Sequence, residues 1–181
     1  MRKVAFAPVA DEQTRVLILG SLPGDLSLAA GRYYANPRNR FWHLVGEIIA
    51  RPDLPELDYD ARLAALLAAG IGLWDAIASA SRPGSLDSAI RNVQPAALVE
   101  LSRALPQLRA VAFNGKASAK IARPQLSQSG VALIDLPSSS PAHAALPLAQ
   151  KQEAWLQLRQ FLAPSSAQPL PCAANGGIGN T

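Results

Sequence analysis

Three short apolar segments constrain the fold of this chain more than any other feature. They are VLILG at 16–20, AVAF at 110–113 and VALIDL at 131–136, and each is continuously apolar rather than alternating. Continuous apolar character is typical of strands buried on both faces of a parallel sheet. Because helical patterns lie between these segments, the sequence predicts an α/β fold with a mostly parallel sheet covered by helices on both faces.

The helices are predicted from apolar residues at helical spacing and from their end signals. The pattern predicts helices over 38–50, from a cap at Asp60 to Gly70, from Pro95 onward, and from Pro147 to near Pro164. The segment IGLWDAIA at 71–78 fits either a short strand or the start of a helix, and we favour the strand.

The length of 181 residues fits one domain, and 49% hydrophobic residues are enough for a core. We expect a single domain over 1–163 and a disordered tail over 164–181, which is rich in turn formers. The only cysteine, Cys172, lies in that tail, which excludes an internal disulfide framework and favours a cytoplasmic setting. No apolar run approaches the ~20 residues that span a bilayer, so neither export nor membrane insertion is expected.

The charge and the common catalytic motifs narrow the function only partly. A net charge of +4 permits a polyanionic partner, but the basic residues are scattered. His43 and His143 belong to no paired metal-binding motif, and neither a Walker loop nor a GxSxG elbow is present. Asp75 and Asp87 are the carboxylates that we expect to face a cleft, although their spacing in the sequence does not identify a catalytic pair.

Each predicted strand runs into an unusual loop, and ligands bind beyond the carboxyl ends of such strands. The loops are GSLPG at 20–24, NGK at 114–116 and LPSSSPAH at 136–143. Each of them could be a plain turn or linker. The three serines between two prolines would also supply donors suited to phosphate oxygens.

The segment YYANPRNRFW at 33–42 interleaves aromatic, amide and cationic groups. Phe41 and Trp42 are expected in the core, whereas the tyrosines precede the helix, where a ring could stack on a base for about 1–3 kcal/mol. Asn36 could cap the turn before the proline. Asn39 is expected inside the first helical turn, where it caps poorly, and is therefore the stronger candidate for chemistry.

Taken together, these motifs, with GIGLWDAI at 70–77 and GSLDSAI at 84–90, closely resemble the hypoxanthine-DNA glycosylase family of the uracil-DNA glycosylase superfamily. The resemblance spans residues 15–162. It implies a three-layer α/β/α fold with a short, mainly parallel four-stranded sheet, no cofactor and no metal. It also implies excision of hypoxanthine from deoxyinosine in DNA, double- or single-stranded, by a protein that we expect to be a monomer.

The resemblance further implies roles for individual residues. Asn39 is matched to the catalytic amide, with Asn36 as the second option, and Leu22 stands where the superfamily usually has an Asn or Asp that holds water. Tyr34 is matched to the aromatic residue that stacks on the flipped base. The other implied base-binding residues are Ser21, Leu22, Pro23, Gly24, Tyr33, Asn36 and Asn114. The implied DNA-binding residues are Ser138, Ser139, Ser140, Pro141, Ala142, His143, Arg38 and Lys116, with a wedge at Pro141 or Ala142.

The chemistry implied is hydrolysis of an N-glycosidic bond after base flipping, which costs a few kcal/mol of unstacking. Fixed dipoles would stabilise the charges that develop as this bond breaks. Three alternatives stay open: a uracil- or xanthine-DNA glycosylase, a catalytically inactive nucleic-acid-binding module, which Leu22 favours, and a hydrolase of free nucleosides or nucleotides.

Overall fold

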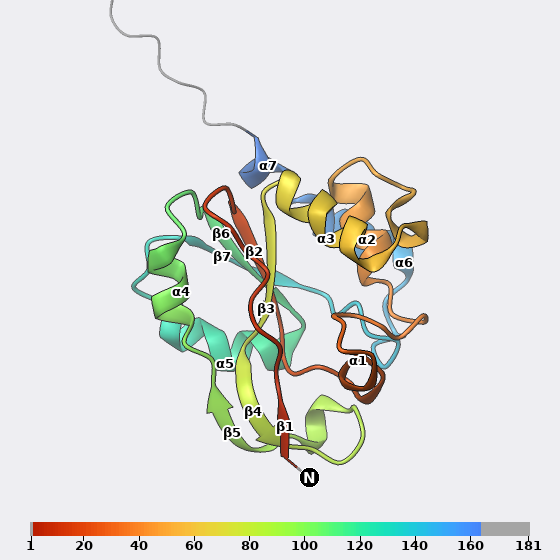
Figure 1. Cartoon of the computed structure of the whole chain (residues 1–181), viewed down its shortest axis with the longest axis vertical. Coiled ribbons are helices and arrows are strands. Elements are labelled where there is room, and N and C mark those ends of the chain that lie inside the picture. The colour runs from red at the N-terminus through yellow and green to blue at the C-terminus, as the bar shows by residue number, and fades with distance from the viewer. Residues whose placement is uncertain (1, 164–181) are drawn as a thin grey trace, which may run out of the picture.

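The computed structural model describes residues 2–163 of the chain (Figure 1). The tail predicted over 164–181, including Cys172, lies outside the described residues. Among the described helices, none combines the length and the apolar character needed to cross a bilayer.

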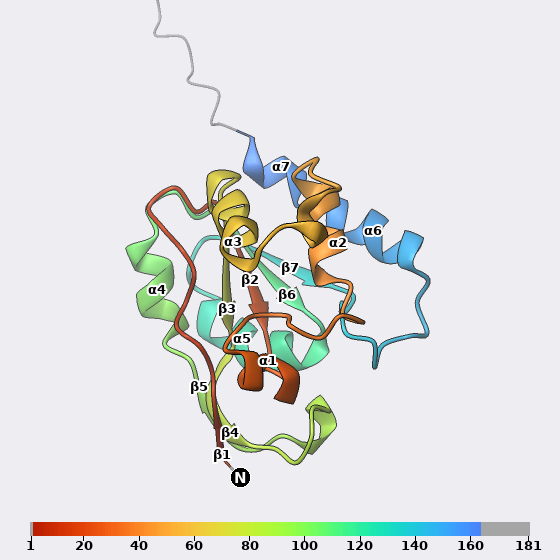
Figure 2. The ribbon, with the colours of Figure 1, turned by 45° about the vertical axis from the view of Figure 1, so that its right-hand side comes forward.

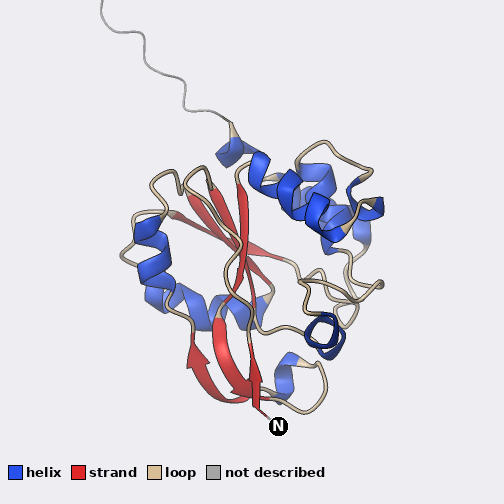
Figure 3. Cartoon of the chain, viewed as in Figure 1, coloured by secondary structure: helices blue, strands red, loops and turns tan. Residues whose placement is uncertain are grey.

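The centre of the fold is a four-stranded parallel sheet, which Figure 3 shows in red. Its strands are β2 (Val16–Gly20), β3 (Ile71–Asp75), β6 (Ala110–Asn114) and β7 (Ala132–Leu136), in the order β3-β2-β6-β7. All three pairings are parallel. The strands predicted from the apolar segments are therefore confirmed, and the segment 71–78, for which we favoured a strand, begins with β3.

Alternate residues of β2 face two separate cores, one on each side of the sheet. Val16 and Ile18 pack with α2 (Phe41–Ile48), α3 (Tyr59–Ala68) and α6 (Leu148–Leu156). Leu17 and Leu19 pack instead with α4 (Leu98–Ala104) and α5 (Lys116–Leu126). Figure 1 shows these helix groups on opposite sides of the sheet, and Figure 2 shows the same arrangement turned by 45°. The three-layer α/β/α architecture is thus confirmed, with each fully buried aliphatic side chain stabilising it by roughly 1.5–3 kcal/mol.

A second, antiparallel sheet was not predicted. It contains β1 (Arg2–Val4), β4 (Ile77–Ser81) and β5 (Arg91–Pro95), with β4 in the middle. The segment 71–78, predicted as one short strand, is divided at Ala76 between β3 and β4. The backbone N–H of Ala76 still donates to the Gly20 carbonyl at 2.8 Å, so the chain stays beside the end of β2 before it enters the second sheet.

Several helix boundaries differ from the predicted ones. Helix α2 begins at Phe41 rather than at residue 38. Pro95 ends β5, and α4 begins three residues later. In α3 the N-cap is Asp58, with Asp60 in the first turn, whereas Gly70 follows the last turn as predicted, with a φ of 83°.

The last predicted helix is two helices, α6 and α7 (Arg159–Leu162). Three short elements complete the chain: α1 (Asp25–Ala30) and the 3-10 helices η1 (Leu54–Glu56) and η2 (Asp87–Ala89). Helix α1 and η2 flank the carboxyl ends of β2 and β3, where they help to form the pocket described next.

Candidate active site

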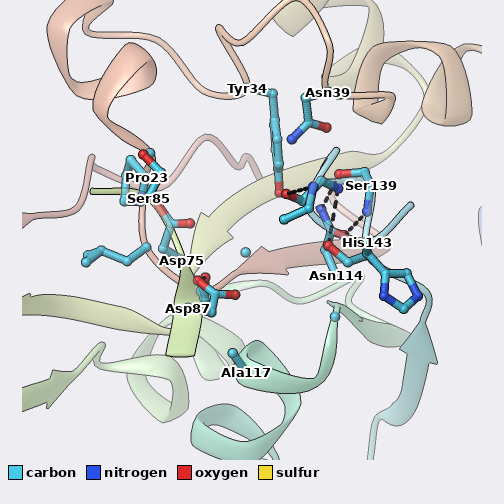
Figure 4. A pocket seen from close by; sticks show the side chains of 18 of the residues that line it. Pro23, Tyr34, Asn39, Asp75, Ser85, Asp87, Asn114, Ala117, Ser139 and His143 are labelled. Carbon is cyan, nitrogen blue, oxygen red and sulfur yellow. Dashed lines mark hydrogen bonds between the residues drawn. The ribbon is translucent and has the colours of Figure 1, made fainter. Parts of the chain in front are cut away.

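A pocket of about 1290 Å³ opens at the carboxyl edge of the parallel sheet (Figure 4). Residues from the loops after β2, β6 and β7 line it, together with residues 33–39 and 85–88. Parallel sheets bind ligands at this edge. The volume exceeds the 300–1000 Å³ or so of ordinary small-molecule sites, and it therefore has room for a nucleotide with its attached backbone.

The loop after β2, Gly20–Gly24, is held in place by Arg82, a buried residue just after β4. Its guanidinium donates to the backbone carbonyls of Leu22, at 3.1 Å, and of Pro23. It also lies 3.6 Å from the carboxylate of Asp87, which accepts the Ser21 hydroxyl at 2.7 Å. These contacts fix the loop that forms one wall of the pocket, and the sequence analysis did not identify Arg82.

Tyr34 forms another wall. Its ring stacks on Phe41 with 3.6 Å between centroids and an angle of 7°, and its backbone has a φ of 53°, which is uncommon for a side chain of this size. The Trp42 indole donates to the Tyr34 carbonyl at 3.2 Å. Burial raises the pKa of the Tyr34 hydroxyl above its ordinary value, so that hydroxyl is neutral at physiological pH. The ring is therefore a rigid, uncharged surface beside the pocket.

Tyr33 lies mainly in the core, where its side chain is 4% exposed. Its hydroxyl donates to the Ala7 carbonyl at 2.8 Å, and its ring meets Phe6 edge-on at 5.2 Å. Tyr33 also touches the pocket. Core packing thus accounts for this ring without a ligand, and its contact with a base stays a prediction.

Asn39 lies before α2 and not inside its first turn, which corrects the predicted position. Its side-chain oxygen accepts the Phe41 backbone N–H at 3.0 Å. Figure 4 shows the amide nitrogen turned toward the side of Tyr34. Asn36 accepts the Arg38 N–H at 3.0 Å, as a turn-capping residue does. Both asparagines line the pocket.

Asn114, the last residue of β6, connects Tyr34 to the serine-proline loop over residues 136–143. Its amide nitrogen donates to the Tyr34 hydroxyl at 3.2 Å and to the Ser139 hydroxyl at 2.9 Å. Its oxygen accepts the Ser139 backbone N–H at 2.9 Å. Asn114 lines the pocket, but the hydrogen bonds in this structure use both of its donors to position neighbouring groups.

The serine-proline loop is stiffened by its own serines. The hydroxyls of Ser138 and Ser140 accept the N–H groups of Ser140 and Ala142, both at 3.2 Å. Lys151 donates to the His143 carbonyl at 2.7 Å. The Arg40 N–H donates to the Ser139 carbonyl at 3.0 Å, so this loop lies directly beside residues 33–42.

The rim of the pocket contains several of the predicted DNA-binding residues, whereas Ser139 is buried at 1% exposure. Pro141, Ala142 and His143 are exposed, and all three line the pocket, as does Lys116. Arg38 lies outside it, in an adjoining depression that Pro141 and His143 also line. The predicted site residues are therefore brought together, with Arg38 on the neighbouring surface.

Asp75 and Asp87 both line the pocket, as expected, but their surroundings differ. Asp87 is exposed and bonded to Ser21 and Arg82. Asp75, at the end of β3, is 3% exposed, and its Oδ2 has no hydrogen-bond partner among the described residues. Burial raises the pKa of Asp75 to about 7, while Arg82 lowers that pKa and Asp87 raises it.

A protein-family model matches nearly all of the described residues. The family model of the uracil DNA glycosylase superfamily matches residues 7–159. The chain belongs to this superfamily. A protein of Methanosarcina barkeri called Hypoxanthine DNA glycosylase is 40% identical over 157 residues, 87% of this chain and 98% of its own length. A protein of the same name from Methanosarcina acetivorans is 41% identical over 143 residues, 79% of this chain and 89% of its own length.

The fold of this superfamily member also matches a solved structure. A solution NMR structure from Methanosarcina acetivorans, provisionally described as a uracil DNA glycosylase, superposes with a TM-score of 0.81 at 38% identity. The match covers 90% of this chain and 99% of that one. The recognition of the family from sequence motifs is thereby confirmed.

In this uracil DNA glycosylase superfamily member, Leu22 brings no polar side chain to the pocket. It is 5% exposed and packs against Ile77 and Ala80. The loop after β2 therefore offers a ligand mainly its backbone. Within residues 2–163, no three His, Cys, Asp or Glu side chains cluster in a way that could hold a metal ion.

Sequence reasoning missed one apolar feature of the site. Leu26 and Leu86 are large, exposed hydrophobic residues, and both line the pocket. An exposed leucine carries no signal by itself, because apolar atoms cover much of any protein surface. Their position beside one pocket becomes visible only in the folded chain.

Proposed function

We propose that this protein is a monofunctional DNA glycosylase that flips hypoxanthine out of DNA and hydrolyses its bond to deoxyribose. The observation that carries the proposal is the ring of Tyr34, held flat on Phe41 at the pocket wall beside the amide of Asn39. The names and the identities of 40% and 41% of the two curated relatives support hypoxanthine as the base. The activity belongs to the domain expected over 1–163, acting as a monomer in the cytoplasm.

Tyr34 supplies the surface on which the flipped base stacks. One face of its ring is covered by Phe41, and the hydrogen bond from Asn114 holds the hydroxyl end of the ring in place. Stacking is worth about 1–3 kcal/mol per base, which offsets much of the few kcal/mol that unstacking from the duplex costs. A rigid ring also loses little entropy when the base binds.

Asn39 supplies a donor for the reaction. Its oxygen is already bonded to the Phe41 N–H, so the group left to interact with a substrate is the amide nitrogen. When the C1′–N9 bond breaks, the electron pair moves to the purine, and a donor stabilises that developing negative charge. Water then bonds to C1′ and releases a proton. This orientation favours donation to the leaving base over reception of a proton from water.

The serine-proline loop, with Arg38 and Lys116, binds the DNA backbone. The oxygens of Ser138 and Ser140 accept bonds within the loop, and their hydroxyl protons are left to donate to a phosphate. Pro141 or Ala142 enters the space that the flipped base leaves. Two alternatives differ from this proposal. A binding module would contact the DNA backbone at the rim but carry out no chemistry. A hydrolase of free nucleosides would carry out the chemistry but need no backbone contacts.

The test is single-turnover excision from oligonucleotides with one inosine, uracil or xanthine, and from free inosine. We expect excision from the inosine oligonucleotide and none from free inosine. Asn39→Ala should lower the rate by roughly two orders of magnitude, as loss of one fixed transition-state donor does, with DNA affinity nearly unchanged. Asn36→Ala, which removes the second candidate amide together with its turn cap, is the matched comparison, and a larger loss of rate in this variant than in Asn39→Ala would reverse the assignment. Lesion binding without excision by the wild-type protein would instead identify a binding module.

A further inference from the structure

We propose that Asp75 is a further catalytic residue of this glycosylase, and that its protonated carboxyl donates a hydrogen bond to the departing purine at O6 or N7. The inference rests on the proposed function and extends it to the leaving group. The roles given to Asn39 and Tyr34 leave the buried carboxyl of the pocket without a function, and this inference supplies one.

The position of Asp75 places its carboxyl beside the stacking surface. In the sheet, Asp75 of β3 is paired with Gly20 of β2. A Cβ atom built on Gly20 would lie 2.6 Å from Asp75 Oδ1 and 3.2 Å from the Tyr34 hydroxyl oxygen. The carboxyl and the hydroxyl therefore meet at the same glycine, so a base stacked on Tyr34 has Asp75 within reach at the hydroxyl end of the ring. Figure 4 shows the Asp75 carboxyl at the wall of the pocket.

The carboxyl of Asp75 is left without the partners that buried acids normally have. Its Oδ2 accepts no hydrogen bond among the described residues, although Asp75 is almost fully buried. The nearby cation, Arg82, is directed elsewhere, because it donates to the carbonyls of Leu22, Pro23 and Gly84 and pairs with Asp87. A buried polar group without a partner costs free energy and is therefore unusual outside functional sites.

The surroundings let this carboxyl carry a proton up to about pH 7, far higher than an ordinary aspartic acid does. Burial raises the pKa of Asp75 to about 7; Arg82 lowers it and Asp87 raises it. The other titratable groups facing it, the hydroxyls of Tyr33 and Tyr34, have raised pKa values and stay neutral, and the charge of Asp75 contributes to both shifts. A carboxylic acid has one O–H donor, whereas an ionised carboxylate would repel the negative purine.

The step balances without any further reagent. The C1′–N9 bond breaks, its electron pair moves to the purine, and the Asp75 proton is shared with or transferred to the purine at O6 or N7. Water forms the new C1′–O bond, and its released proton replaces the one that Asp75 has given. The products are free hypoxanthine and an abasic site. If Asp75 acted instead as an ionised base that accepts a proton from water, the excision rate would rise with pH.

The test is the pH profile of single-turnover hypoxanthine excision between pH 5.5 and 8.5. We expect the wild-type rate to fall as the pH rises through about 7, by up to about tenfold per pH unit. Asp75→Asn retains the shape and a permanent N–H donor, so it should keep the rate at pH 6 within about tenfold and should lose the pH dependence. Asp75→Ala should lower that rate by about 10²–10³.

The matched control is Asp87→Asn, a second carboxylate of the same pocket. Its profile should still fall with pH, with a midpoint below the wild-type one, because the charge of Asp87 raises the pKa of Asp75. Thermal unfolding and DNA affinity of each variant separate lost chemistry from lost folding. If the wild-type rate rises with pH and excision is lost in Asp75→Asn, Asp75 does not act as a donor, although the proposed function still holds. Absence of excision at every pH overturns the proposed function itself.

Discussion

The side-chain amide of Asn114 joins three parts of the pocket, and its removal tests whether they act as one unit. Asn114→Ala deletes three hydrogen bonds: one to the Tyr34 hydroxyl and two to Ser139. Ser139 is 1% exposed, so water cannot readily replace the lost partner. The variant also releases the Tyr34 ring and the serine-proline loop from their shared support.

The expected loss of stability follows from these bonds. A neutral hydrogen bond contributes about 1 kcal/mol, and a buried N–H left without a partner costs about 1–3 kcal/mol. The Ser139 N–H becomes such a group, while the longer bond to Tyr34 adds less. The free energy of unfolding should therefore fall by about 2–4 kcal/mol, and Tm should fall by roughly 5–15 °C for a chain of this size.

The assay combines thermal unfolding, followed by circular dichroism, with single-turnover excision at a temperature where both proteins are folded. Excision should fall at least about tenfold, since a 1 Å displacement of catalytic groups costs up to about 10²-fold. Ser139→Ala, which removes only the hydroxyl partner, should cost about 1 kcal/mol and serves as the control. A Tm within about 2 °C of wild type for Asn114→Ala would show that these bonds do not hold the loops.

Three further predictions follow from the same pocket. In the folded chain Asp75 stays protonated up to its pKa of about 7, whereas in the unfolded chain it does so only up to the ordinary pKa of 3.8. Wild-type stability should therefore fall as the pH rises between these values. Asp75→Asn should then raise the free energy of unfolding by about 2–4 kcal/mol at pH 8 and change it little at pH 4, as measured by denaturant titration. Gly20→Ala places a methyl group 2.6 Å from Asp75 Oδ1 and should cost about 1–3 kcal/mol by thermal unfolding, together with most of the excision rate. Lys116→Ala should reduce the slope of log affinity against log salt by about 1 in a DNA-binding titration, and an unchanged slope would remove Lys116 from the phosphate contacts.

The parallel sheet could be predicted from the sequence because its strands are apolar on both faces. Val16 to Leu19 serve two cores at once, and such a segment has few alternatives to a buried strand. The antiparallel sheet has no such signal. Its strand β5, RNVQP, contains no fully buried residue, so its pattern does not differ from that of a polar loop.

The candidate site was predicted in outline, since each strand of a parallel sheet delivers its loop to the same edge. Its internal connections could not be predicted, because they depend on partners distant in sequence. Arg82 reaches the carbonyls of Leu22 and Pro23 some 60 positions away, and Asn114 reaches Ser139. The lack of a hydrogen-bond partner for Asp75 Oδ2 is harder still to predict, because it depends on which residues do not approach this carboxyl.

The lack of partners around Asp75 also explains how the pocket can act without a polar residue at Leu22. The side chain of Leu22 is packed against Ile77 and Ala80, so this position brings no polar side chain with which to hold an attacking water. The polar groups free to act are both donors, the amide nitrogen of Asn39 at any pH and the acid of Asp75 below about pH 7, and donors suit a departing base. A neutral donor strengthens as negative charge develops on the purine, and the low-dielectric surroundings that raise the pKa of Asp75 enlarge that effect. Burial thus destabilises the fold at Asp75 and, by the same electrostatics, favours loss of the base.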